Sequence, residues 1–156
     1  MFFNLEESVS GDGCQPGLVS KVKQGGVRIP QVLSIEGEPD IRKLLSLSLN
    51  YKGRYEVITA ENGTVGLEEA KKRKFDCILM DSLMPVMDGY QTCKRLKRNS
   101  QTKDIPVIFL TAQTQQKEIE KGMALGAVDY LLKPFDPMKL PDQIEQILAR
   151  VGKGSD

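Results

Sequence analysis

From Gln31 onward, short apolar runs alternate with longer amphipathic stretches. The apolar runs are typical of strands, and apolar residues spaced three and four positions apart are typical of helices. The predicted strands span residues 32–35, 55–60, 77–80, 106–110 and 130–132. The predicted helices span residues 40–50, 64–74, 90–99, 115–125 and 137–151. The chain therefore reads as five successive strand–helix units.

Strict alternation with short connections predicts parallel strands covered by helices on both faces. The run Cys77–Met80 is apolar throughout, as expected of a strand buried on both sides. We therefore expect an α/β fold with a doubly wound, flavodoxin-like, five-stranded parallel sheet, (βα)5. The last helix takes up the chain nearly to its end, so we expect no effector domain.

The first 29 residues lack this pattern and are rich in Gly, Ser and other polar residues. Such a composition favours a flexible N-terminal extension. We expect residues 30–152 to form the folded domain and residues 153–156 a short tail.

The composition narrows the range of functions. The formal net charge is +1, and the chain contains three cysteines and no histidine. These features argue against broad binding to nucleic acid or membrane, and against a zinc site or a histidine-based catalytic centre. The N-terminus does not resemble a signal peptide, so we expect a cytoplasmic protein. The basic stretches at residues 71–74 and 94–98 are interpreted as solvated helix faces.

Polar side chains stand where four predicted strands end: Glu36, Asp81, Thr111 and Lys133. The carboxyl ends of parallel strands meet at one edge of the sheet, so these groups should converge on one crevice. An exposed aspartate there can act as a nucleophile toward phosphorus. An ammonium and a hydroxyl can stabilise the new dianion, and neighbouring acids normally hold Mg²⁺.

Three motifs carry a family resemblance. They read DSLMPVMDG at residues 81–89, Thr111-Ala112, and DYLLKPF at residues 129–135. The chain thereby resembles a bacterial response-regulator receiver domain of the single-domain type. The first motif is close to the family pattern D-x-x-M-P-x-M-D-G, and the others match its switch threonine and its D-Y-L-x-K-P-F pattern.

The resemblance implies a role for each matching residue. Asp81 would be the phosphoacceptor, and Thr111 and Lys133 would contact the phosphoryl group. Tyr130 would turn inward when Thr111 moves, although ordinary packing is a rival interpretation. The Lys133–Pro134 bond is expected to be cis.

The resemblance also implies Mg²⁺ as the cofactor, held by Glu36, Asp81 and the backbone carbonyl of Leu83. The sequence departs from the family at Gly37, where a receiver usually has an acidic metal ligand. Loss of that ligand should weaken the metal site. An alternative interpretation is that Gly37 serves an unusual backbone angle. Glu38 could help only if its loop turned inward.

Two hypotheses follow for the function. In the first, a sensor histidine kinase or a histidine phosphotransfer protein phosphorylates Asp81, and a changed surface signals to a protein partner in trans. That surface would comprise residues 115–125, 130–132 and 137–151. In the second, Gly37 has disabled the metal site and the chain is a phosphorylation-independent interaction module. Both describe a signalling protein and not an enzyme. A flavin-binding flavodoxin relative is disfavoured, because the acidic first loop would repel a phosphate.

Overall fold

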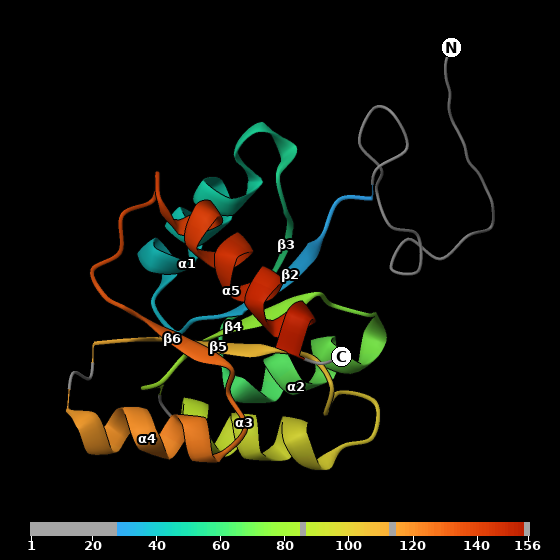
Figure 1. Cartoon of the computed structure of the whole chain (residues 1–156), viewed down its shortest axis with the longest axis vertical. Coiled ribbons are helices and arrows are strands. Elements are labelled where there is room, and N and C mark those ends of the chain that lie inside the picture. Colours follow the sequence, from blue (N-terminus) through green and yellow to red (C-terminus); the bar gives the residue numbers. More distant parts are fainter. Residues whose placement is uncertain (1–27, 85–86, 113–114, 155–156) are drawn as a thin grey trace.

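Five parallel strands form a single sheet (Figure 1). The computed structural model describes residues 28–84, 87–112 and 115–154. The strands are β2 (Gln31–Ile35), β3 (Glu56–Ala60), β4 (Cys77–Asp81), β5 (Val107–Thr111) and β6 (Asp129–Leu132). Their order across the sheet is β3-β2-β4-β5-β6. The predicted doubly wound parallel sheet is confirmed, with strand ends shifted by one residue.

Five α-helices follow the strands in alternation. They are α1 (Pro39–Asn50), α2 (Gly63–Lys72), α3 (Gly89–Arg98), α4 (Gln116–Ala124) and α5 (Leu140–Gly154), with a short 3₁₀ turn, η2 (Tyr51–Gly53), after α1. Side-chain caps fix two helix starts: Asn62 Oδ1 accepts the Val65 N–H at 2.9 Å, and Asp88 Oδ1 accepts the Gln91 N–H at 2.9 Å. No helix within the described ranges is long and apolar enough to cross a membrane.

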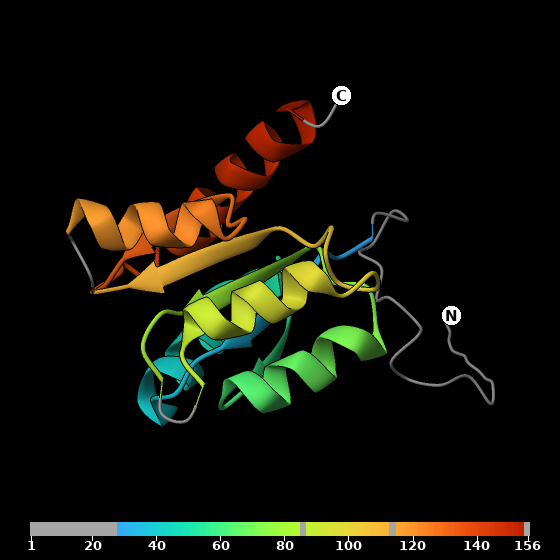
Figure 2. The same ribbon diagram turned by 90° about the horizontal axis from the view of Figure 1, so that it is seen from below.

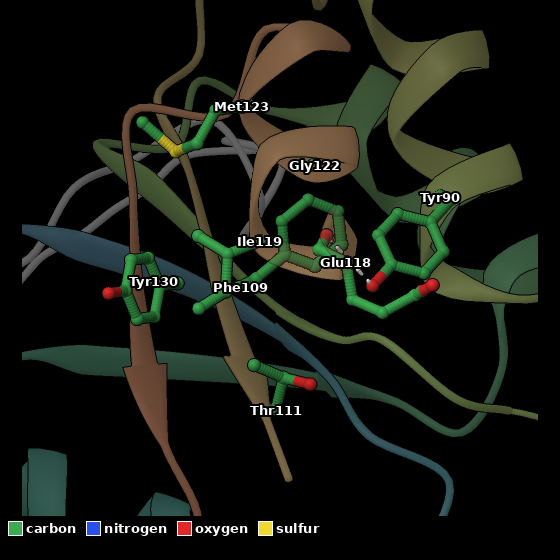
Figure 3. A pocket seen from close by; sticks show the side chains of 8 residues that line it. All are labelled: Tyr90, Phe109, Thr111, Glu118, Ile119, Gly122, Met123 and Tyr130. Atoms are coloured by element: carbon green, nitrogen blue, oxygen red, sulfur yellow. Dashed lines mark hydrogen bonds between the residues drawn. The ribbon is translucent and has the colours of Figure 1, made fainter. Parts of the chain in front are cut away.

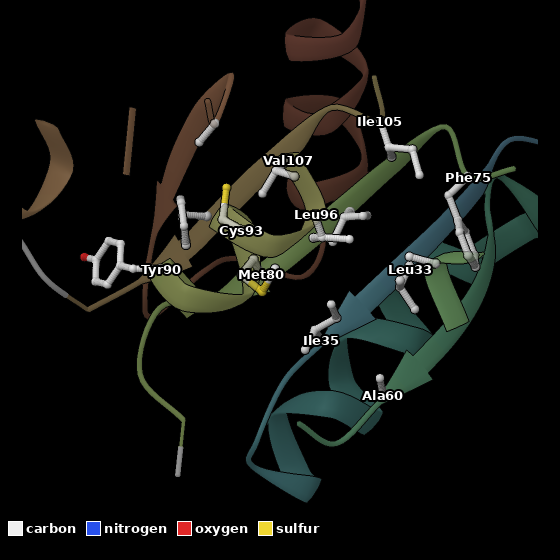
Figure 4. Close-up of a cluster of buried hydrophobic side chains, with 14 of the residues drawn as sticks. Leu33, Ile35, Ala60, Phe75, Met80, Tyr90, Cys93, Leu96, Ile105 and Val107 are labelled. Atoms are coloured by element: carbon white, nitrogen blue, oxygen red, sulfur yellow. The ribbon is translucent and has the colours of Figure 1, made fainter. Parts of the chain in front are cut away.

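The sheet separates two hydrophobic cores. One core, shown in Figure 4, lies on the side of α2, α3 and α4 and includes Leu33, Met80, Leu96 and Phe109. The other lies on the side of α1 and α5 and includes Leu79, Leu110 and Ile144. Figure 1 shows these helices in two layers, one on each face of the sheet, and Figure 2 looks toward the layer of α2, α3 and α4. Since side chains alternate along a strand, successive residues of a strand point toward opposite cores.

The prediction that the last helix begins at Pro137 is wrong. Residues 137–139 form a turn, in which the Asp136 carbonyl accepts the N–H groups of Lys139 and Leu140 at 3.0 Å. Pro141 has no N–H to donate to the Pro137 carbonyl. That carbonyl accepts the Ser48 hydroxyl of α1 at 2.5 Å instead. The helix therefore begins at Leu140, and it continues to Gly154, past the predicted end at Val151.

Most of the expected N-terminal extension, residues 1–27, and the last two residues of the expected tail lie outside the described residues. Arg28, the first described residue, forms an ion pair with Asp76 at 2.5 Å, next to the start of β4.

Candidate functional site: a charged centre at the carboxyl edge of the sheet

The four polar residues predicted from strand ends lie on four neighbouring strands. Asp81 and Thr111 are the last residues of β4 and β5, while Glu36 and Lys133 directly follow β2 and β6. Because β2, β4, β5 and β6 are adjacent in the parallel sheet, all four residues lie along its carboxyl edge. The structure thus brings to one edge the groups that the sequence predicted there.

Three of these residues form a buried charged centre. The Lys133 ammonium lies 3.1 Å from Glu36 Oε1 and 3.4 Å from Asp81 Oδ1. The side chains of Glu36 and Asp81 are only 1% and 7% exposed, and that of Lys133 is 15% exposed. Ion pairs with so little solvent are weakly screened. The peptide bond that follows, Lys133–Pro134, is cis, as the resemblance implies.

Backbone N–H groups also face the Asp81 carboxylate. The Leu83 N–H donates to Oδ1 at 3.2 Å, and the Gly37 N–H lies 3.5 Å from Oδ2. The amide N–H groups and the ammonium are donors that could also bind a larger anion attached to this carboxylate.

The Glu36 carboxyl has a raised pKa. Burial is the main cause, because it penalises the charged form, and the negative charge of Asp81 adds to it. The Glu38 N–H, which donates to Glu36 Oε2 at 3.2 Å, and the Lys133 ammonium both lower the pKa, but less than burial raises it. Two close carboxylates therefore rely on one lysine for charge compensation.

The donors at this edge are suitable in kind for Mg²⁺, which prefers carboxylate and carbonyl oxygens. Among the described residues, Glu36 Oε1 has no hydrogen-bond donor besides its ion pair with Lys133, which leaves this acidic oxygen to face a cation. The described residues nevertheless contain no group of three or more His, Cys, Asp or Glu side chains that could hold a metal ion. The residues fit a magnesium ion that keeps several of its waters, held by fewer acids than a receiver usually offers.

The position that lacks an acid is Gly37. Its φ angle is not in the left-handed region, which among the described glycines is adopted by Gly53 and Gly126. The backbone at Gly37 therefore does not require glycine. Glu38 is exposed and lies next to it as the N-cap of α1.

A second group of residues lies on the other side of the sheet edge. Ser82 Oγ and Thr111 Oγ1 are 2.7 Å apart and hydrogen-bonded, and both residues are buried. Tyr130 belongs to the same side, where it packs against the core beneath α4. Ser82 was missed at the sequence level. The available signal was its place directly after Asp81, which puts it on the opposite face of the strand.

Thr111 and Tyr130 line a small cavity under α4, together with side chains from α3, β5 and α4 (Figure 3). The Tyr130 hydroxyl points away from the other labelled side chains in that view. The cavity volume is about 10 Å³, which is about the least that holds one water. An aromatic ring could enter only if α4 side chains such as Ile119 moved.

Comparison with known proteins identifies the family. The family model of the response regulator receiver domain matches residues 32–145. The chain belongs to the response regulator receiver family. Receivers of this family generally accept phosphoryl groups, interact with histidine kinases and act as signalling modules.

Curated relatives contain more than a receiver. A probable transcriptional regulator of Porphyridium aerugineum is 38% identical over 80% of this chain and 50% of its own length. A DNA-binding dual master transcriptional regulator of Synechocystis is 40% identical over 79% of this chain and 48% of its own length. The chain spans about half the length of these two relatives.

Solved structures agree with the fold over nearly the whole of the similar chains. The chemotaxis protein CheY4 of Vibrio cholerae is 36% identical, with a TM-score of 0.72 over 76% of this chain and 98% of that chain. The receiver domain of a Pseudomonas aeruginosa sensor histidine kinase is 28% identical, with a TM-score of 0.70 over 78% of this chain and 98% of that chain. That second structure has a magnesium ion coordinated in its active-site cleft.

Proposed function

We propose that this receiver accepts a phosphoryl group on Asp81 from a phosphohistidine of a sensor histidine kinase or a histidine phosphotransfer protein. The observation that carries the proposal is the position of the Lys133 ammonium, 3.4 Å from Asp81 Oδ1 within a nearly solvent-free site. A fixed cation beside the nucleophile stabilises the charge that arrives with the phosphoryl group.

In the transfer step, an Asp81 carboxylate oxygen attacks phosphorus. The new P–O bond forms as the P–N bond to histidine breaks, and the leaving nitrogen takes up a proton from water. Lys133 and the N–H groups of Leu83 and Gly37 supply donors around the dianion. Thr111, at the end of the neighbouring strand, supplies a hydroxyl once it turns toward Asp81.

Magnesium bound at this edge would offset the repulsion between the carboxylates and the incoming phosphoryl group. Glu36, Asp81 and the Leu83 carbonyl are the residues that would hold it. We infer that the ion binds more weakly than at a receiver with three acids, because affinity rises with the number of charged ligands.

The output of the proposed switch is a changed surface on α4, β6 and α5, read by a partner protein in trans. Met123 of α4 and Leu132 of β6 are 40% and 45% exposed, which gives this surface apolar contact points. Tyr130 lies on β6 beneath it and would couple it to Thr111. We place this exchange in the cytoplasm, without direct contact to nucleic acid or membrane. We further propose that residues 30–152 form the receiver, with residues 1–29 as an N-terminal extension and 153–156 as a tail.

A second candidate function is favoured by Gly37. If the loss of this acid abolishes magnesium binding, the chain serves as a docking module whose state does not depend on phosphorylation. The two candidates differ only in whether Asp81 can be phosphorylated.

The deciding experiment incubates the protein with acetyl phosphate and Mg²⁺ and measures its intact mass. We expect one phosphoryl adduct in the native protein and none in Asp81→Asn. An adduct that forms in Gly37→Asp but not in the native protein would overturn the first proposal and support the second. Persistence of the adduct in Asp81→Asn would show that another residue is the acceptor.

A further inference from the structure

Ser82, the residue directly after the proposed phosphoacceptor, binds the switch threonine. Its hydroxyl lies 2.7 Å from that of Thr111, and the two residues are 1% and 4% exposed. We propose that Ser82 is a positioning residue that holds the Thr111 hydroxyl on the α4 side of the sheet and so disfavours the phosphorylated state. This inference rests on the proposed function of Asp81.

The alternation of side chains along the strands places the two hydroxyls away from the charged centre. Along β4, Leu79 packs in the α1–α5 core and Met80 in the core on the other face. Asp81 continues the first series and Ser82 the second. The charged centre with Lys133 accordingly lies on one side of the sheet edge and the hydroxyl pair on the other.

The strand register places Ser82 and Thr111 next to each other. Asp81 pairs with Leu110 across β4 and β5. Ser82, the first residue after β4, therefore comes beside Thr111, the last residue of β5, as their hydrogen bond shows. On β5, Phe109 packs in the core beneath α4, and Thr111 follows it on the same face. Thr111 also lines the cavity under α4 (Figure 3). The Thr111 hydroxyl is therefore held against Ser82 and beneath α4.

Ser82 competes for the Thr111 hydroxyl with a phosphoryl group attached to Asp81. To reach the Asp81 side, Thr111 must rotate about its Cα–Cβ bond, and its contact with Ser82 breaks. A buried hydrogen bond of this kind is worth a small net free energy, so its loss must be recovered from the new contact. Ser82 thus contributes to the free energy that is needed to move Thr111 toward Asp81. Alanine at this position would lower that free energy.

Beryllofluoride, a stable mimic of a phosphoryl group on aspartate, provides the test. Its binding in the presence of Mg²⁺ is followed by ¹⁹F NMR in the native protein and in Ser82→Ala. We expect about two- to tenfold tighter binding in Ser82→Ala, the change that corresponds to one net hydrogen bond. Ser34→Ala is the matched control, because Ser34 is a buried serine of β2 whose hydroxyl has no hydrogen-bond partner. Its affinity should equal that of the native protein.

A second measurement needs no substitution. Three-bond couplings to the Thr111 methyl report its side-chain rotamer, which should differ between the free protein and the beryllofluoride complex. Equal or weaker binding in Ser82→Ala, or one unchanged rotamer in both states, would overturn the role of Ser82. Absence of beryllofluoride binding in the native protein and in both variants, with Thr111 still in one rotamer, would instead count against the proposed function.

Discussion

At the residue scale, Gly37 stands where the family resemblance implies an acidic metal ligand. Its N–H lies 3.5 Å from Asp81 Oδ2, and its φ angle is not in the left-handed region that favours glycine. The backbone conformation at residue 37 therefore does not explain why the chain has glycine there in place of an acid. The interpretation that Gly37 serves an unusual backbone angle is wrong.

Restoring the acid should strengthen magnesium binding. We expect Gly37→Asp to bind Mg²⁺ at least about tenfold more tightly, since even changes beyond the direct ligands typically alter affinity by 10- to 100-fold. Calorimetric titration measures the dissociation constant. Gly152→Asp adds the same charge on α5, where an added Cβ would meet open space, and serves as the control. Equal affinities in the two variants would show that residue 37 does not face the ion.

Cys77 should be chemically inert in the folded protein. Its thiol is completely buried in β4, and burial raises its pKa to about 12. Because the raised pKa leaves almost no thiolate at pH 8, we expect slow alkylation by iodoacetamide. Peptide mass spectrometry should show rapid modification of Cys77 only after unfolding in urea. Rapid labelling in the native state would mean that β4 opens readily.

At the element scale, the start of α3 is packed directly on the end of β4. The Gly89 N–H donates to the Ser82 carbonyl at 3.0 Å. A Cβ built on Gly89 would lie 2.2 Å from the Asp81 carbonyl oxygen. The glycine of the first motif therefore allows a helix to approach the backbone that carries the proposed phosphoacceptor.

We expect Gly89→Ala to lower the free energy of unfolding by about 1–3 kcal/mol, as overpacking against atoms that cannot move aside does. Gly152→Ala should instead raise it by up to about 1 kcal/mol, because alanine is the better helix former and nothing opposes its methyl group. Urea unfolding measures both values. A stabilised Gly89→Ala protein would show that α3 can shift away from β4.

The sequence predicts the positions of the helices better than the residues at which they begin. Apolar spacing located all five helices, because each buries one stripe of its surface. The start of α5 was misplaced by three residues, since Pro137 is a good first residue of a helix by local rules. The contact between the Pro137 carbonyl and Ser48 of α1, which forms only in the folded protein, accompanies the later start at Leu140.

At the scale of the whole molecule, the described residues form two hydrophobic cores, one on each face of the sheet. The residues that fill these cores lie between Val32 and Val151. Each face of the sheet is covered by helices from the same range (Figure 1).

Removal of residues 1–27 should therefore leave the receiver folded. We expect its melting temperature to change by less than about 4 °C, a shift that corresponds to roughly 1 kcal/mol in a domain of this size. Scanning calorimetry of residues 28–156 beside the full chain tests this. A larger fall would show that the N-terminal residues pack against the domain.

The sequence by itself determined the order of elements and the residues at the strand ends. It could do so because parallel strands are buried on both faces and therefore read as continuous apolar runs. Polar residues then stand out where each run ends. That the metal site lacks an acid at Gly37 stays a prediction from the family resemblance. Tertiary structure alone decided which groups meet across neighbouring strands. The register between β4 and β5 pairs Asp81 with Leu110, and the residues that follow them, Ser82 and Thr111, are hydrogen-bonded. Register depends on packing between strands that lie far apart in the chain.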